Sequence, residues 1–176
     1  RTLTKPVVNG KKVHSSYSVI RNGNYLFEDF TVESSRLFEE YYPIEINPDI
    51  SLEEKKIKMQ EWWEANWSLM LKHGMHFNII KKVARDPSLQ LKEETNLFLN
   101  FLNEKDIPLL IFSSGLGDII KEFLKHQKLY LKNIHLVANE FIFDDSGKVI
   151  GFSKPMITVF SKNEYSINGN RYLAEI

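Results

Sequence analysis

The sequence predicts an α/β protein in which a mainly helical first half is joined to a second half of alternating strands and helices. Two observations lead to this fold class. Stretches with apolar side chains at helical spacing fill much of residues 27–103. Short continuous apolar runs, bounded by proline and glycine as buried parallel strands are, begin at residue 107. We therefore interpret the chain as an α-helical module inserted beside an α/β core.

Local signals mark the helices of the first half. Pro43 should interrupt the first of them, because proline lacks the backbone N–H that a helix uses. Ser51 and Glu54 form a capping box at the start of the second, and Gly74 is a suitable C-terminal stop. The four expected helices cover residues 27–42, 51–74, 77–85 and 92–103.

The second half alternates between strand and helix signals. A hairpin is expected around Ser146-Gly147. A last apolar run, "MITVF" at residues 156–160, is expected to be a strand that ends just before Lys162. The remaining elements expected here are a strand at 107–114, a helix at 117–126 and a strand at 133–138.

Composition excludes several classes of protein. The 176 residues include 23 basic and 23 acidic side chains, so the chain lacks the basic surface of a nucleic-acid-binding protein. Apolar runs are all shorter than the roughly 18–20 residues that cross a membrane, so no membrane association is expected. The chain has no cysteine, which excludes disulfides and thiolate metal sites and fits a reducing compartment.

The octet "IFSSGLGD" places hydroxyls and glycines where a buried strand meets a helix. In open parallel sheets, ligands bind at the carboxyl ends of strands, and a helix N-terminus there attracts a phosphate. Gly115 and Gly117 would let the backbone approach the ligand, and Ser113 could donate its hydroxyl. A tight turn in which Ser or Asp caps the helix remains the alternative.

Three other residues are candidates for the same site. Lys162 could reach the sheet edge and pair with a phosphate, although most lysines are solvated surface residues. Glu45 in "YYPIEINP" could accept a hydrogen bond from a nucleobase amino group, or be a surface carboxylate. Asn66 lies on an apolar helix stripe and needs a polar partner, either a neighbouring residue or a ligand.

Metal sites are not expected within the chain. His73 and His76 lack a carboxylate at a matching spacing. The run Asp144–Gly147 has some character of a calcium loop, but a hairpin turn explains it better.

Six segments in order resemble the cytosolic pyrimidine 5′-nucleotidase (type III) family of haloacid-dehalogenase-like phosphatases. These segments are "RTLT", "YYPIEINP", "EEKKIKMQEWW", "IFSSGLGD", "FIFDDSGKVIGF" and "VFSKNE", and they extend through nearly the whole chain. The resemblance implies a Rossmann-like core with an inserted helical cap. It also implies magnesium-dependent hydrolysis of nucleoside 5′-monophosphates through an aspartyl-phosphate intermediate, in the cytoplasm.

The resemblance assigns roles to five residues. Ser113 matches the family's phosphate-binding serine, and Lys162 matches its phosphate-binding lysine. Ser114 matches the position after the serine, whose backbone N–H contacts the phosphate. Glu45 matches the cap glutamate that reads the base. Asn66 occupies a position where relatives carry a nucleotide-contacting serine, which leaves CMP, UMP and 7-methyl-GMP all open as substrates.

The family's first motif, D-x-D-x-T-L-[ST], is represented here only from Arg1 onward. Both catalytic aspartates would precede residue 1, and the motif that completes the magnesium site would follow Ile176. We therefore expect this chain by itself to be inactive, as a fragment with both ends missing. The expected division is residues 1–7 as a remnant of the first core motif, 8–88 as cap and 89–176 as part of the core.

Three interpretations stay open at this stage: a nucleotidase, a catalytically inactive nucleotide-binding protein, and an unrelated helical interaction module. The ordered motifs favour the first. Without the strand that carries the aspartates, the apolar run Leu109–Phe112 would present an open edge, so the isolated chain should be marginally stable.

Overall fold

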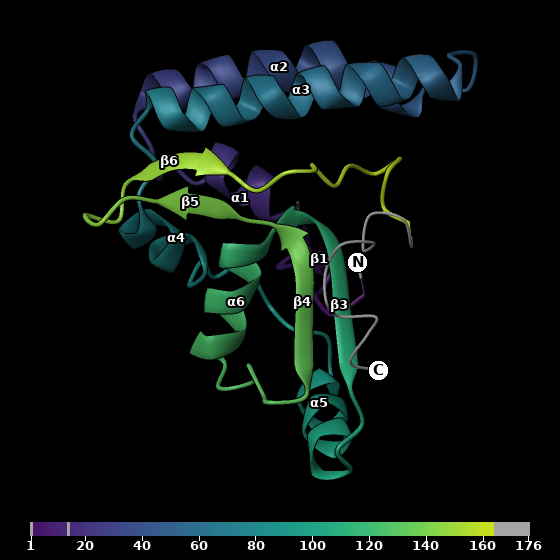
Figure 1. The fold of residues 1–176 in the computed structure, drawn as a ribbon, viewed down its shortest axis with the longest axis vertical. Helices are drawn as coiled ribbons and strands as arrows, with labels where there is room; N and C mark the ends of the chain where they lie inside the picture. Colours follow the sequence, from purple (N-terminus) through teal and green to yellow (C-terminus); the bar gives the residue numbers. More distant parts are fainter. Residues whose placement is uncertain (1, 14, 164–176) are drawn as a thin grey trace.

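The computed structural model describes residues 2–13 and 15–163 of the chain. Two long antiparallel helices form one layer, which we call the helical hairpin, and the strands and shorter helices lie beneath it (Figure 1). The hairpin consists of α2 (Glu28–Ile46) and α3 (Leu52–Lys72). The other helices are α1 (Ser16–Asn22), α4 (Phe77–Val83), α5 (Thr95–Glu104) and α6 (Gly117–His126).

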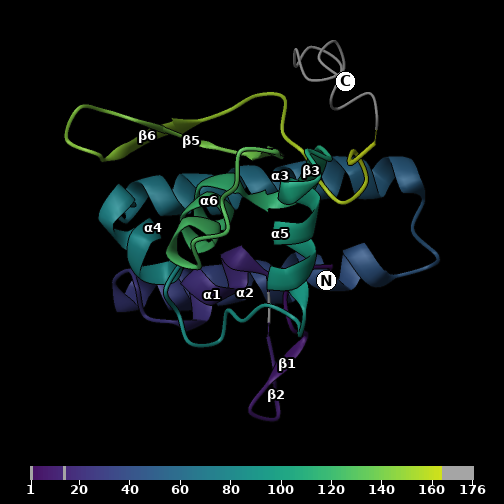
Figure 2. The same cartoon turned by 90° about the horizontal axis from the view of Figure 1, so that it is seen from below.

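The strands form separate two-stranded sheets within the described residues. The parallel pair β3 and β4 is joined through α6, which confirms the expected strand–helix–strand unit. The short antiparallel pair β1 and β2, with its turn at Asn9-Gly10, projects from the body of the molecule (Figure 2). The six strands are β1 (Val7–Val8), β2 (Lys11–Lys12), β3 (Leu109–Leu116), β4 (Ile134–Asn139), β5 (Phe141–Phe143) and β6 (Val149–Phe152).

The ends of α3 follow from its sequence as expected. The Ser51 hydroxyl accepts a hydrogen bond from the Glu54 backbone N–H at 3.2 Å, so the predicted N-cap is confirmed. At the other end Gly74 has φ +69°, and the N–H of Met75 returns to the carbonyl of Met70 at 3.0 Å. This is the left-handed glycine stop that the sequence predicted.

The prediction that Pro43 interrupts the preceding helix is wrong. Helix α2 continues through Pro43 to Ile46, and the N–H of Asn47 still bonds the Pro43 carbonyl at 3.1 Å. Packing against α3 supports the helix just before Pro43, where Tyr41 stacks on Trp62 with an interplanar angle of 6°. Tertiary contact here outweighs the hydrogen bond that proline removes.

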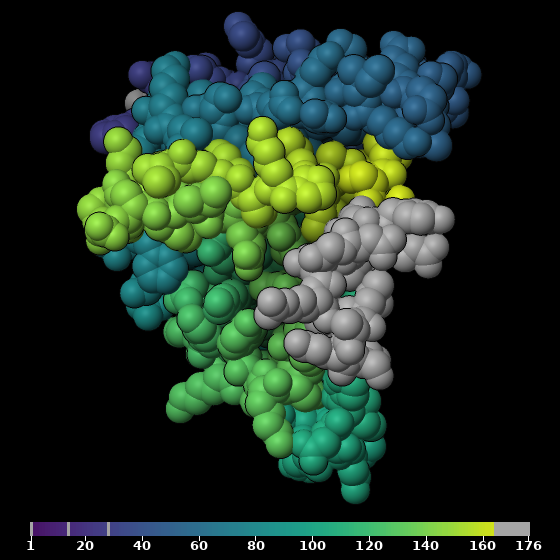
Figure 3. All heavy atoms as spheres, in the orientation of Figure 1, coloured from purple at the N-terminus to yellow at the C-terminus, as the bar shows by residue number. Residues whose placement is uncertain are grey.

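A continuous hydrophobic core connects the helical hairpin to the strands. Trp67 of α3 stacks on Phe152 of β6 with ring centroids 4.1 Å apart. Figure 3 shows the β5–β6 hairpin and the segment after it lying directly beneath the helical hairpin. Fully buried members of this core include Ile20, Phe30, Met70, Met75, Ile80 and Val149. Among residues 2–13 and 15–163, none of the helices has the length and hydropathy of a membrane span.

Candidate functional site

The carboxyl end of β3 departs from regular pairing at the predicted phosphate-binding residues. Phe112 pairs with Val137 and Leu116 pairs with Asn139, so three residues of β3 face a single residue of β4. Ser113, Ser114 and Gly115 therefore form a bulge. The strand was expected to end at residue 114, but it runs on to Leu116 and meets α6 directly. A bulge of this kind re-aims side chains away from the ladder.

Side-chain hydroxyls hold the bulge in shape. The Ser113 Oγ accepts a hydrogen bond from the N–H of Gly115 at 3.0 Å, and the Ser16 Oγ accepts one from the N–H of Leu116 at 3.2 Å. A Cβ on Gly115 would lie 3.0 Å from the Ser16 oxygen and 3.2 Å from the Ser113 oxygen. Both hydroxyls therefore lie beside Gly115, and each keeps a hydrogen that it can donate.

Ser16 is a residue that the sequence reasoning missed. It lies 100 positions from its partner Leu116, and nothing in the local pattern of residues 15–16 indicates that contact. The only available signal was Ser15, whose side chain caps α1 by accepting from the N–H of Ser18 at 3.3 Å.

The N-terminus of α6 lies directly behind the bulge. The N-cap residue Leu116 makes no side-chain cap hydrogen bond of its own, and its N–H is bound by the Ser16 hydroxyl instead. The Asp118 carboxylate instead accepts the N–H of Phe141 at 2.8 Å, and burial raises the pKa of that carboxyl. First-turn N–H groups of a helix attract anions, and α6 begins directly after the serine bulge.

Lys162 reaches the same strand from the segment that follows β6. Its Nζ lies 5.6 Å from the ring centroid of Phe112, the residue just before Ser113. The side chain is exposed, and it forms no salt bridge with the described residues. The structure thus brings Lys162 and the two serines to one end of β3.

The expectation of a strand at residues 156–160 is wrong. The chain forms a turn there, in which the Thr158 Oγ1 accepts the N–H groups of Phe160 and Ser161 at 3.3 and 3.2 Å. The Ser161 Oγ in turn accepts the N–H of Thr158 at 2.8 Å. Local hydroxyl bonds of this type compete with strand pairing, and the apolar pattern alone does not reveal them.

Glu45 lies in the last turn of α2 and is half-buried. Burial raises the pKa of its carboxyl, and the ammonium of Lys55 on α3 partly offsets that rise. The Lys55 Nζ also lies 6.0 Å from the ring centroid of Phe160. The segment that carries Phe160 and Lys162 therefore lies between Lys55, beside Glu45, and the end of β3.

Asn66 is buried and hydrogen-bonded within the protein. Its Oδ1 accepts the hydroxyl of Tyr17, and its Nδ2 donates to the carbonyl of Trp62 at 2.8 Å. Burial raises the pKa of the Tyr17 hydroxyl, which favours its role as a donor. Neighbouring residues thus supply the partner that the sequence required. The contact with nucleotide that the resemblance implies for Asn66 stays a prediction.

Aromatic rings surround the turn of α2 that leads to Glu45. Phe38 stacks on Tyr42 with centroids 4.8 Å apart, and the guanidinium of Arg21 lies 4.0 Å from the Phe38 centroid. Trp62 lies beside Tyr41 and Phe38 at 6.0 Å from each. Ring faces of this kind are suited to stacking against a nucleobase.

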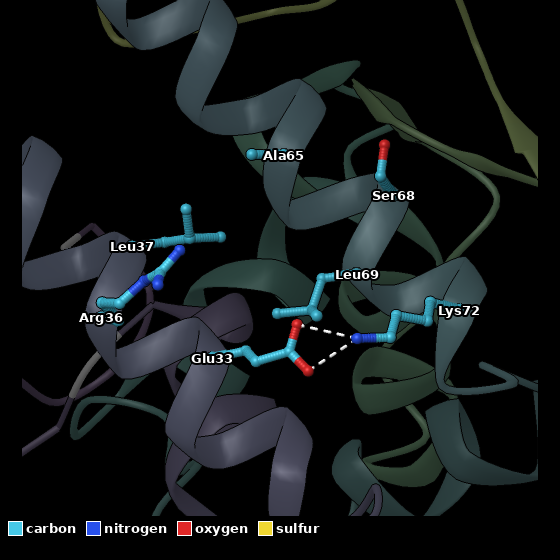
Figure 4. Close-up of a pocket in the computed structure, with 7 residues that line it drawn as sticks. All are labelled: Glu33, Arg36, Leu37, Ala65, Ser68, Leu69 and Lys72. Atoms are coloured by element: carbon cyan, nitrogen blue, oxygen red, sulfur yellow. Dashed lines mark hydrogen bonds and ion pairs between the residues drawn. The ribbon is translucent and has the colours of Figure 1, made fainter.

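The pocket of about 260 Å³ between α2 and α3 lies elsewhere (Figure 4). Its polar edge is the ion pair of Lys72 and Glu33 at 2.7 Å. None of the five predicted site residues lines it. The lining consists of Glu33, Arg36, Leu37, Ala65, Ser68, Leu69 and Lys72.

The histidines and the acidic loop have structural partners. His76 caps α4 by accepting the N–H of Asn78 at 3.0 Å, and the His73 ring lies edge-on to Phe30. The Asp144 carboxylate accepts the N–H groups of Ser146 and Lys148, which is a hairpin turn as expected. Across residues 2–13 and 15–163, no three His, Asp or Glu side chains gather to hold a metal ion.

Comparison with known proteins identifies the family. The family described as Pyrimidine 5′-nucleotidase (UMPH-1) matches residues 1–176. A 7-methylguanosine phosphate-specific 5′-nucleotidase of Homo sapiens is 34% identical over 175 residues, which are 99% of this chain and 58% of the human protein. The corresponding Drosophila melanogaster nucleotidase is 33% identical over 168 residues, or 95% of this chain and 52% of that protein.

Solved structures agree with the sequence comparison. Cytosolic 5′-nucleotidase IIIB bound to cytidine superposes with a TM-score of 0.74 at 31% identity, covering 92% of this chain and 54% of that one. A phosphoserine phosphohydrolase-like protein from Francisella tularensis, at 17% identity and TM-score 0.53, shares the fold alone. The fold is therefore α/β and haloacid-dehalogenase-like. The chain spans a little over half the length of these nucleotidases, and it belongs to the pyrimidine 5′-nucleotidase family.

Proposed function

We propose that the protein containing this chain hydrolyses nucleoside 5′-monophosphates to a nucleoside and phosphate. The observation that carries the proposal is the gathering of Ser113, Ser114 and Lys162 at the carboxyl end of β3, beside the N-terminus of α6. Hydroxyl, backbone N–H and ammonium groups together match the charge and geometry of a phosphate.

The residues of this chain would bind and orient the substrate. The Ser113 hydroxyl would donate to a phosphate oxygen, and the Lys162 ammonium would neutralise charge that spreads over the phosphoryl oxygens during transfer. Glu45 would accept a hydrogen bond from the base. This requires a substrate that spans from β3 to the last turn of α2, and Phe160 and Lys162 lie along that path.

The attacking group follows from the family resemblance. We expect an aspartate to attack phosphorus and to form an aspartyl-phosphate that water then hydrolyses, with a second aspartate as acid and base. Magnesium is part of the same expectation. The described residues do not form a site that fits it, and we assign none of them to the metal.

The relatives' names suggest two kinds of substrate. One is specific for 7-methylguanosine phosphate, and a related structure holds cytidine. Both bases carry an exocyclic amino group that a carboxylate such as Glu45 can accept from, so we propose CMP and 7-methyl-GMP ahead of UMP. A cytoplasmic location completes the proposal and fits a chain without cysteine.

Phosphate release from CMP, UMP, GMP and 7-methyl-GMP by the full-length gene product, with and without magnesium, tests the proposal. We expect magnesium-dependent release, and a loss of about 10²–10³-fold in kcat for Ser113→Ala or Lys162→Ala, as for other positioned donors. Ser68→Ala and Lys132→Ala, both at exposed sites, are matched controls that should leave kcat unchanged. Nucleotide binding without any release would identify an inactive binding protein instead.

A further inference from the structure

Asn139 is a buried polar residue at the end of β4, where it pairs with Leu116 across the sheet. Its side chain is 1% exposed, and it belongs to none of the motifs that carry the family resemblance. A buried primary amide needs two acceptors for its hydrogens and a donor for its oxygen, or it destabilises the fold.

The amide satisfies these needs by joining two separate segments. Its Nδ2 donates to the carbonyl of Ser114 at 3.0 Å and to the carbonyl of Ile157 at 2.8 Å. Its Oδ1 accepts the N–H of Ile157 at 2.8 Å. The Asn139 amide thus bonds both the N–H and the carbonyl of Ile157, as the backbone of a paired strand does. Its second hydrogen bonds the Ser114 carbonyl in the β3 bulge.

The two segments carry the two halves of the proposed phosphate site. Ser114 is next to Ser113 on the bulge. Ile157 leads directly into the turn closed by Thr158, and Lys162 follows that turn. Because this turn is a compact hydrogen-bonded unit, fixing Ile157 also fixes the point from which Lys162 extends. One side chain therefore sets the separation between the hydroxyl and the ammonium.

We propose that Asn139 is a positioning residue that holds Lys162 at the distance from Ser113 and Ser114 which phosphate binding requires. The inference rests on the proposed function, since it takes those three residues to be the phosphate ligands. Asn139 itself touches no substrate, and it acts through Ile157 and the turn after it.

Binding of inorganic phosphate by the full-length gene product provides the test. The variants are Asn139→Leu, Lys162→Met and the double variant, measured by calorimetric titration. Each single change should weaken binding about tenfold, the effect expected for one hydrogen bond to a charged group. If Asn139 acts through Lys162, the double variant should bind no worse than Lys162→Met alone. Losses that multiply in the double variant would overturn the inference.

A matched control separates positioning from general destabilisation. Asn133 lies at the opposite end of the same two strands, is also buried, and donates to the carbonyl of Ile107 at 2.8 Å. Asn133→Leu should lower the melting temperature as Asn139→Leu does, but should leave phosphate affinity unchanged. If Asn133→Leu and Asn139→Leu both lose phosphate affinity, general destabilisation of the fold explains the loss, and the positioning role of Asn139 is overturned.

Asn139→Asp gives a second, milder variant. An ionised carboxylate keeps the acceptor for the N–H of Ile157 but cannot donate to the two carbonyls, and protonation restores one donor. Phosphate affinity relative to the unmodified protein should therefore rise as pH falls. If the phosphate affinity of Asn139→Asp, divided by that of the unsubstituted protein, does not change with pH, the assigned hydrogen bonds are contradicted.

Hydrogen exchange distinguishes failure of the inference from failure of the proposed function. The N–H of Ile157 should exchange faster in Asn139→Leu whether or not the site binds phosphate, and unchanged exchange would overturn the inference alone. Full phosphate affinity in Lys162→Met would overturn the proposed phosphate site, and the inference with it.

Discussion

Gly115 lies beside two hydroxyl groups, since a Cβ added there would be 3.0 Å from the Ser16 oxygen and 3.2 Å from the Ser113 oxygen. We expect Gly115→Ala to weaken phosphate binding by about tenfold, because the added Cβ must displace the Ser16 or the Ser113 oxygen. Phosphate titration of the full-length gene product measures this. Gly151→Ala is the control, since a Cβ there meets only Ile142 at the ordinary distance of 3.6 Å. Equal affinity in both variants would contradict the assigned geometry of the bulge.

The carboxyl of Glu45 has opposite effects on stability and on base recognition. Burial raises its pKa in the folded protein, so ionisation of this group destabilises the fold. Its contribution to stability is present below the ordinary glutamate pKa of 4.5 and is lost as pH rises through the raised value. Glu45→Gln should therefore raise the melting temperature at neutral pH, and the gain should disappear as pH falls below 4.5. Glu39→Gln, on the exposed side of the same helix, should show neither effect.

The proposed role of Glu45 in base recognition predicts that Glu45→Gln changes the base preference of the full-length gene product. A glutamine side chain no longer offers a charged acceptor to an exocyclic amino group. We expect kcat/KM to fall about tenfold for CMP and 7-methyl-GMP but little for UMP, as measured by phosphate release. A uniform fall for all three nucleotides would place Glu45 outside the base site.

At the scale of single elements, the N-cap of α3 offers a local test of stability. Ser51→Ala removes the acceptor of the Glu54 N–H and should cost about 1 kcal/mol of unfolding free energy. Ser68→Ala, at an exposed serine in the C-terminal part of the same helix, should be neutral or slightly stabilising, because alanine has the higher helix propensity. Denaturant unfolding of the two variants measures the difference, and equal midpoints would show that the cap contributes nothing.

Elements with strong local signals could be predicted from the sequence, and the others could not. Helix α3 begins and ends where Ser51 and Gly74 indicate, because a cap and a left-handed glycine act within a few residues. Helix α1 was missed because it lies in a mainly polar stretch of the sequence and carries too few apolar side chains to show a helical period. The extension of α2 past Pro43 depends on packing against α3, which a local pattern does not contain.

The candidate site shows the same division. Ser113, Ser114 and Lys162 could be found because short motifs and order along the chain identify them. Asn139 bonds Ile157, 18 positions away, and Ser16 bonds Leu116, 100 positions away. No rule of local spacing indicates contacts at such separations. Long-range polar contacts of this kind need the fold before they can be recognised.

At the scale of the whole molecule, apolar surface remains uncovered. Within the described residues β3 pairs with β4 alone, and its residues from Leu109 to Gly115 are only half-buried. Helix α5 exposes Leu97, Phe98 and Phe101 by 51–66%. Parallel strands are ordinarily covered on both faces and paired on both edges, and an open edge promotes aggregation.

We therefore expect the 176 residues expressed alone to unfold at low temperature over a broad transition. Calorimetry of this chain beside a version extended to the length of its relatives measures the difference, and the extended protein should melt higher and more sharply. A sharp transition of the isolated chain at high temperature would show that these surfaces do not limit its stability.

The packing of α3 gives the molecule an optical signal of its own. The chain has three tryptophans, Trp62, Trp63 and Trp67, and all of them lie in this one helix. Trp67 rests on Phe152 of β6, while Trp62 lies beside Tyr41 of α2. The tryptophan fluorescence of the chain therefore comes from α3 alone. Without any attached label, it reports whether the helical hairpin is packed against β6.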